Sequence, residues 1–339
     1  MPEVILAIRS FAGLLLSFVL LSACAHEAPP ASASVASPGA PAAQAPALPP
    51  AYVLENTEVR DIPSKILKRD YQIYVSLPAS YREQPDRYYP VLFVTDATYA
   101  FPLIRSIARR VGDHGDGLDD FILIGLSYAR GDTPVYSRDR DYTPTPHGSP
   151  DAVSDMPGRP VLYGEADGYR RFIAEEVFPF VAGNYRADMH DKIYAGHSYG
   201  GLFGMQILLT DPTMFEHYIL GSPSLQFDKK IMFTREQAYA ASHKDMPADV
   251  FVAIGSFETI RPGSDNPRYH HENDMVRNAQ DMEKLLKSRR YPGLRIHTTI
   301  INDEDHLTVF PAIITRGLMA MLPATPKAPN TGPQGSPSQ

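Results

Sequence analysis

A serine lies between two glycines in the segment GHSYG, at positions 196–200 of this 339-residue sequence. This G-x-S-x-G pattern is typical of a sharp turn from a strand into a helix, which exposes the serine hydroxyl for nucleophilic attack. Small residues are needed two positions before and after the serine because the backbone passes close to them. A strand-like run at 192–195 precedes the motif and an apolar segment follows it, as such a turn requires. We therefore predict that Ser198 is a nucleophile.

Two residues further along the chain complete a catalytic set. A serine hydroxyl is a weak nucleophile and needs a base to accept its proton, and His306 is the candidate base. The base needs an acid that orients the imidazole and stabilises its charged form, and Glu258 is the preferred candidate. The order serine, acid, histidine is that of α/β-hydrolases. Asp265, Asp303 and Asp305 are alternative acids.

Serine attack on an ester carbonyl creates an oxyanion, which needs hydrogen-bond donors. The backbone N–H of Tyr199, at the start of the expected helix, is one candidate. The second donor is expected from the loop that follows a buried strand at 91–94, which selects the backbone N–H of Ala97 or Thr98. Asp96, just before them, has the alternative role of capping the next helix.

Strand patterns alternate with helical patterns along the chain, and most of the strands are continuously apolar. This alternation predicts an α/β protein of the α/β-hydrolase fold, with a mostly parallel central sheet and helices on both faces. Ser198, Glu258 and His306 each follow a predicted strand, so all three are expected at the carboxyl edge of the sheet. The predicted strands are 70–77, 91–94, 121–125, 192–195, 217–220, 250–255 and 294–301, and the predicted helices are 101–110, 167–185, 199–210, 228–245, 274–290 and 308–321.

A long stretch from Ser127 to about Gly164 shows little periodicity and is rich in arginine, aspartate, tyrosine and proline. A loop of this length inside a compact domain is expected to be a functional loop or lid. The helix that follows it is expected to kink at Pro179.

The charge of the chain gives no support for nucleic-acid binding. The formal net charge is −7, from 32 basic and 39 acidic residues, whereas nucleic-acid binding needs a basic surface. The pairs His270-His271 and Asp113-His114 lack the spacing of metal ligands. We therefore expect no metal site and no cofactor.

The N-terminus predicts export and a lipid anchor. An apolar run at 4–21, interrupted by Arg9, ends in the small residues that precede Cys24, the one cysteine of the chain. A short apolar region closed by small residues is typical of a secretory signal. Its end resembles a bacterial lipobox, which implies cleavage before Cys24, acylation of its thiol and, because Ala25 follows, sorting to the outer membrane. A plain signal peptide with secretion, or an uncleaved anchor, is the alternative.

Composition divides the chain into four parts. After a signal peptide with a lipobox at 1–24, residues 25–50 are almost wholly alanine, proline and serine and cannot bury enough apolar surface to fold. They predict a disordered linker. The catalytic domain is expected at 51–323, followed by a disordered tail at 324–339.

Four segments resemble one known family: 196–225, the DYTPTPHG run at 141–148, EEVFPFVAGNYR at 175–186 and DEDHLTVFPAIITRGL at 303–318. Together they look like the esterase-D-like α/β-hydrolases that include the enterobactin and salmochelin hydrolases. The resemblance extends over about residues 55 to 322, essentially the whole expected domain.

This resemblance implies that Ser198 is the nucleophile and His306 the base. Some members work with a Ser-His dyad, which leaves the role of Glu258 open. Arg138 or Arg140 resembles a substrate-contacting position, and an arginine could pair with an anionic catecholate or its ferric complex. The family's usual Asp-Gly after the third strand is Asp-Ala in this chain.

We predict a serine esterase that hydrolyses carboxylic ester bonds, those of a ferric or apo catecholate siderophore. The substrate is a small molecule, and the protein is expected in the periplasm, attached to the membrane through Cys24. Because fold does not fix substrate, a carbohydrate acetyl or feruloyl esterase is one alternative. A non-catalytic ligand-binding lipoprotein is the other.

Overall fold

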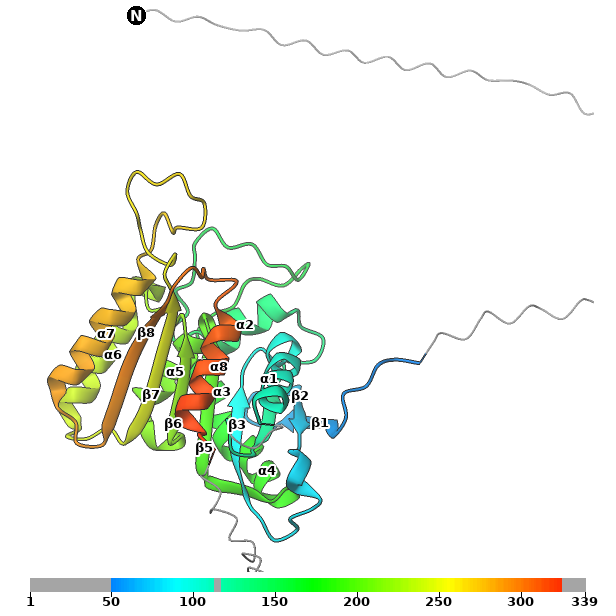
Figure 1. Ribbon diagram of the computed structural model, residues 1–339. Coiled ribbons are helices and arrows are strands. Elements are labelled where there is room, and N and C mark those ends of the chain that lie inside the picture. The colour runs from blue at the N-terminus through cyan, green and yellow to red at the C-terminus, as the bar shows by residue number, and fades with distance from the viewer. Residues whose placement is uncertain (1–49, 113–116, 325–339) are drawn as a thin grey trace, which may run out of the picture. The chain divides into compact units, whose positions relative to one another are not determined.

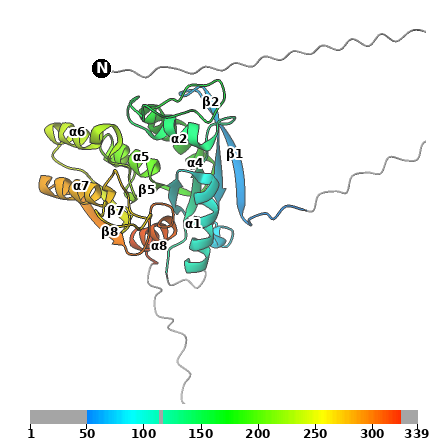
Figure 2. The ribbon, with the colours of Figure 1, turned by 90° about the horizontal axis from the view of Figure 1, so that it is seen from above.

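The computed structural model describes residues 50–112 and 117–324, and in this part of the chain one eight-stranded sheet carries helices on both faces (Figure 1, Figure 2). The predicted signal peptide, Cys24 and nearly all of the predicted linker lie outside the described residues, as does the tail beyond residue 324. In the described ranges no helix combines the length and the apolar character needed to cross a bilayer.

The strands follow the order β1-β2-β4-β3-β5-β6-β7-β8 across the sheet. The β1–β2 and β2–β4 pairs are antiparallel, and every pair from β4 to β8 is parallel. The predicted mostly parallel sheet is therefore confirmed. The strands are β1 (Thr57–Ser64), β2 (Arg69–Ser76), β3 (Tyr89–Val94), β4 (Ile122–Leu126), β5 (Ala187–His197), β6 (His217–Gly221), β7 (Ala248–Gly255) and β8 (Leu294–Ile301).

Burial explains which strands the sequence predicts. β4, with the sequence ILIGL, is buried along its whole length, and such strands form continuous apolar runs because helices cover both faces. Seven strands coincide with predicted runs to within a few residues, although β5 starts five residues earlier than predicted. β1 is not predicted, because it is an edge strand of mostly polar residues in which Ile62 is the one buried apolar side chain.

Helices α1 and α8 pack on one face of the sheet and the others pack on the opposite face (Figure 2). The helices are α1 (Ala97–Gly112), α2 (Pro134–Tyr142), α3 (Ala166–Phe172), α4 (Phe178–Asn184), α5 (Tyr199–Leu208), α6 (Phe227–Ser242), α7 (Met275–Arg289) and α8 (Phe310–Met321).

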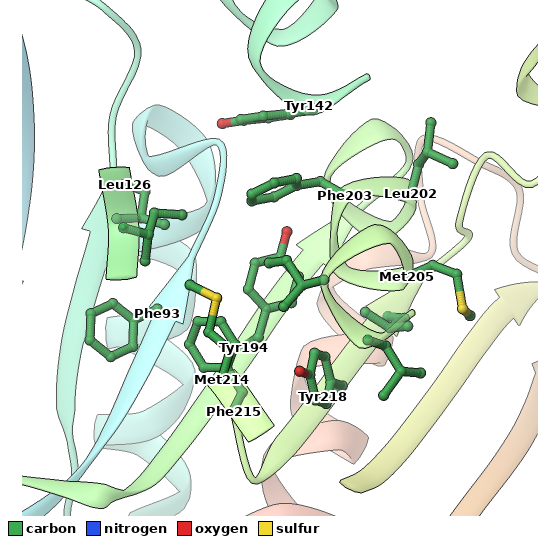
Figure 3. Packing of buried hydrophobic residues seen from close by; sticks show 14 of the residues in the cluster. Phe93, Leu126, Tyr142, Tyr194, Leu202, Phe203, Met205, Met214, Phe215 and Tyr218 are labelled. Atoms are coloured by element: carbon green, nitrogen blue, oxygen red, sulfur yellow. The ribbon is translucent and has the colours of Figure 1, made fainter. Parts of the chain in front are cut away.

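Aromatic side chains pack α5 against the middle of the sheet and α2 against α5. Figure 3 shows Tyr142, Phe203 and Tyr194 lying one above another. Phe203 of α5 meets the ring of Tyr194 of β5 edge-on at a centroid distance of 6.0 Å. Its other side stacks on Tyr142 of α2 at 5.8 Å. All three side chains are buried, so the end of α2 is held over α5, next to the G-x-S-x-G turn.

Two predictions about the middle of the chain need correction. The stretch 127–164 is not wholly irregular, because α2 lies within it; Thr133 caps the helix by accepting a hydrogen bond from the backbone N–H of Tyr136. The helix predicted at 167–185 is interrupted by a π-helical turn, Ile173–Val177. The interruption therefore comes one turn before the predicted kink at Pro179, which lies near the start of α4.

Candidate active site

Ser198 occupies a strained turn between β5 and α5. Its φ and ψ are 60° and −115°, a backbone conformation that residues other than glycine rarely adopt. Its backbone N–H donates to the carbonyl of Gly221 at the end of β6, 2.9 Å away. A Cβ at Gly196 would lie 2.5 Å from the carbonyl oxygen of Gly200, and one at Gly200 would overlap Thr95. Both glycines are therefore needed where they stand.

The structure brings Ser198, His306 and Glu258 into one hydrogen-bonded chain. Nε2 of His306, in the loop after β8, lies 3.0 Å from Oγ of Ser198. Nδ1 of the same ring lies 2.6 Å from Oε2 of Glu258, which follows β7. This geometry allows Nε2 to accept the serine proton while the carboxylate holds Nδ1–H and stabilises the imidazolium.

The carboxylate of Glu258 is fully buried and fixed by two further donors. The hydroxyl of Ser222 donates to Oε1 at 2.6 Å, and the backbone N–H of Gly255 donates to the same atom at 2.8 Å. Because Oε1 is bonded in this way, Oε2 faces His306. Ser222 lies in the segment after β6, another strand that ends at this edge, and sequence reasoning did not single it out.

The alternative acids point elsewhere. Asp305 accepts a hydrogen bond from Nε of Arg268 at 2.6 Å, and Asp303 pairs with Nη1 of the same arginine at 3.3 Å. Asp265 is exposed. Through these two aspartates Arg268 holds the loop that carries His306 in place. Glu258 is the carboxylate in contact with the imidazole.

A second histidine packs against His306. The ring centroids of His197 and His306 are 4.7 Å apart. Burial, followed by the proximity of His306, lowers the pKa of His197 well below its usual value. His197 is therefore a neutral packing residue beside His306.

The predicted oxyanion donors lie at the starts of two helices. Tyr199 is the first residue of α5, and Ala97 and Thr98 are the first two residues of α1. Backbone N–H groups in the first turn of a helix lack intrahelical partners and are available to an anion. β3 and β5 are neighbours in the sheet, so the loop before α1 lies against the Ser198 turn.

Arg138 of α2 lies beside this turn. Its Nε is 2.7 Å from Oδ1 of the buried Asp96, and its guanidinium carbon lies 5.7 Å from the ring centroid of Tyr199. Asp96 also accepts a hydrogen bond from the hydroxyl of Tyr128 at 2.8 Å. Burial raises the pKa of the Asp96 carboxyl, and the charge of Arg138 opposes that rise. Asp96 is thus the partner of an arginine rather than a simple helix cap.

Arg140, the other predicted substrate contact, faces away from the site, and that prediction is wrong. Its side chain is fully buried, with Nη1 2.6 Å from Asp132 and Nε 2.7 Å from Asp141. A guanidinium enclosed by two carboxylates inside the protein cannot reach a substrate. Its role is to hold α2 together with the segment before it.

Replacing Arg140 with methionine is expected to destabilise the fold by about 3 kcal/mol, because two largely buried carboxylates each lose one of their two arginine partners. The midpoint of thermal unfolding should fall by roughly 10 °C. Calorimetry of the variant beside Arg130→Met measures this, since Arg130 and its partner Asp61 are exposed. Equal midpoints for the two variants would show that the buried pairing contributes no stability.

Comparisons with known proteins agree with this architecture. The model of the Esterase family matches residues 64–309. The chain is 30% identical over 277 residues to the ferri-bacillibactin esterase BesA of Bacillus subtilis strain 168, covering 79% of this chain and 90% of that protein. It is 29% identical over 270 residues to the siderophore enterobactin esterase of Emericella nidulans, covering 74% of this chain and 88% of that protein.

Among solved structures, the BES protein from Bacillus cereus superposes with a TM-score of 0.64 at 26% identity, covering 81% of this chain and 99% of that one. The family match spans most of the described domain, and the parallel sheet with a serine turn after β5 fits it. The chain belongs to the Esterase family and is a carboxylic ester hydrolase of the α/β-hydrolase fold.

Proposed function

We propose that this esterase hydrolyses the ester bonds of a catecholate siderophore, with Ser198 as nucleophile, His306 as base and Glu258 as the acid that orients it. The observation that carries the proposal is the hydrogen-bonded chain from Glu258 through His306 to Ser198 at the carboxyl edge of the sheet. The substrate class is supported by the two curated relatives, which are named as esterases of ferri-bacillibactin and of enterobactin.

The proposed reaction proceeds through an acyl-enzyme. Oγ of Ser198 attacks the ester carbonyl while its proton moves to Nε2 of His306, and the resulting oxyanion accepts hydrogen bonds from the backbone N–H of Tyr199 and of Ala97 or Thr98. The bond to the leaving alcohol breaks as His306 returns the proton to that oxygen. A water molecule then attacks the acyl carbon, gives its proton to His306, and the bond to Oγ breaks as Ser198 regains a proton.

The side chains around Ser198 suit a flat, anionic acyl group. Tyr199 meets Phe227 edge-on at a centroid distance of 5.8 Å. Burial raises the pKa of Tyr199 to about 12, so its ring stays neutral. Arg138 is about a quarter exposed, at 24%, and its pairing with Asp96 uses Nε, which leaves the two Nη groups to bind a catecholate oxygen.

Replacing Arg138 with lysine is expected to raise KM for a tri-catecholate ester about tenfold, because lysine loses the forked hydrogen-bonding geometry. Lysine keeps a positive charge beside Asp96, which is 1% exposed and would be destabilised without a cation. Steady-state kinetics should show a several-fold smaller change in KM for the neutral p-nitrophenyl acetate. An equal change for both esters would mean that Arg138 does not recognise the catecholate.

The substrate class is tested by a panel of esters given to the purified protein. The panel contains a tri-catecholate siderophore with and without iron, a feruloyl sugar, an acetylated xylan fragment and p-nitrophenyl acetate, and kcat/KM is measured for each. We expect the siderophore to be preferred. Higher values for the sugar esters would replace this proposal with a carbohydrate esterase. A protein inert on every ester would instead favour the non-catalytic, ligand-binding alternative.

The proposal includes the lipid anchor at Cys24 and a periplasmic location, both supported by the sequence of residues 4–24.

A further inference from the structure

A second serine hydroxyl touches the reacting oxygen. Ser224, in the segment after β6, has its Oγ 3.4 Å from Oγ of Ser198. Its backbone N–H donates to the carbonyl of Ser198 at 3.2 Å, so its position relative to the turn is fixed. The side chain is only 3% exposed. The same segment holds Ser222, which donates to Glu258, so it contacts both ends of the hydrogen-bonded chain.

The direction of the contact between the two hydroxyls follows from the proposed mechanism. Ser198 has one hydroxyl proton, and Nε2 of His306 must accept it, at 3.0 Å, for the histidine to act as a base. Oγ of Ser198 can then meet Ser224 only as an acceptor, so Ser224 donates. At 3.4 Å this hydrogen bond is weak in the resting enzyme.

We infer that Ser224 is a further catalytic residue, whose hydroxyl donates to Oγ of Ser198 and stabilises the negative charge on that atom during the reaction. This inference rests on the proposed function, in which Ser198 is the nucleophile. A hydrogen bond to a charged oxygen is shorter and about twice as strong as one to a neutral oxygen. The contact therefore strengthens as the proton of Ser198 moves to His306.

The hydroxyl would assist both halves of the reaction. In acylation Oγ of Ser198 loses its proton to His306 as it forms a bond to the acyl carbon, and the donor stabilises the partial charge on Oγ. In deacylation water adds to that carbon, the bond to Oγ breaks, and the same donor stabilises the departing oxygen until His306 protonates it. Ser224 keeps its own proton throughout.

Replacing Ser224 with alanine is expected to lower kcat for p-nitrophenyl acetate by about 10- to 100-fold with little change in KM. The second-order rate of labelling by a fluorophosphonate should fall by a similar factor, because the same oxygen attacks phosphorus. Ser224→Cys, which keeps a weak donor of similar shape, should give intermediate rates.

The matched control is Ser76→Ala. Ser76 is a buried serine at the end of β2, paired with Leu123 near the start of β4 and hence at the opposite edge of the sheet. Both rates should stay at the wild-type level in this variant, and thermal unfolding of each protein checks that its fold is retained.

Wild-type rates in Ser224→Ala would overturn the inference, and so would faster ones, which would mean that Ser224 draws the Ser198 hydroxyl away from His306. If Ser224→Ala fails to fold, wild-type rates in the folded Ser224→Cys variant would overturn it equally. Failure of the proposed function is distinguishable: the wild-type protein would then take no fluorophosphonate on Ser198. Labelling at Ser198 with equal rates in both proteins refutes only the role of Ser224.

Discussion

Replacing Ser198 with alanine is expected to lower kcat by about 10⁴-fold or more on every ester that the protein cleaves. The reason is that, among the described residues, Oγ of Ser198 is the only hydroxyl oxygen in hydrogen-bond contact with Nε2 of His306. Initial rates with p-nitrophenyl acetate at saturating concentration measure the effect. Residual activity reflects the oxyanion donors and substrate binding alone.

The control for this variant is its fold, because Ser198 sits in a strained conformation. Alanine carries a Cβ as serine does, so the strain is unchanged and the unfolding midpoint should stay within a few degrees of the wild-type value. A folded alanine variant that retained a tenth or more of the wild-type rate would exclude Ser198 as the nucleophile.

Replacing Glu258 with glutamine is expected to lower kcat by about 10³- to 10⁴-fold. The amide has nearly the same shape but no charge, so it cannot stabilise the imidazolium of His306, and its NH₂ group can select the wrong tautomer. The carboxylate of Glu258 is buried and accepts hydrogen bonds from Ser222 and Gly255. No other carboxylate among the described residues forms a hydrogen bond with His306, so none can replace it. The pH dependence of kcat/KM should be measured along with the rate.

Asp305→Asn is the comparison for this variant. Asp305 is the alternative acid next to His306 in the sequence, and it pairs with Arg268. It should lose far less activity than Glu258→Gln. Near-wild-type rates in Glu258→Gln would mean that a Ser-His dyad is sufficient. A larger loss of activity in Asp305→Asn would mean that Asp305, and not Glu258, is the acid that orients His306.

The location of the candidate site could be predicted from sequence for a simple physical reason. Central parallel strands are buried on both faces, so they appear as apolar runs, and their carboxyl ends share one edge of the sheet. Ser198 and Glu258 each follow such a run, whereas His306 follows β8, a partly exposed edge strand that ends at the same edge. The structure links Glu258 to His306 and His306 to Ser198 by hydrogen bonds.

The choice between Arg138 and Arg140 could not be made in the same way. α2 is short and polar, with no apolar stripe to reveal a helix. Residues two apart on a helix point to opposite sides, so only one of the two arginines could face Ser198. The structure turns Arg138 toward Tyr199 and encloses Arg140 between carboxylates.

The roles of Ser222 and Ser224 depend on contacts that sequence patterns do not encode. Both lie in a short segment after β6, and the carboxyl-edge rule applied to that strand would have placed them near the site. Which hydroxyl meets Glu258 and which meets Ser198 depends on the backbone path, including the positive φ of 38° at Ser222.

The most direct test of the central claim is to label the wild-type protein with a fluorophosphonate, digest it and locate the adduct by mass spectrometry, with and without an excess of a tri-catecholate siderophore. We predict a single adduct on the peptide that contains Ser198, and slower labelling when the siderophore is present. An adduct on another residue would contradict the assignment of the nucleophile, and labelling of Ser198 at an unchanged rate would contradict siderophore binding at this site.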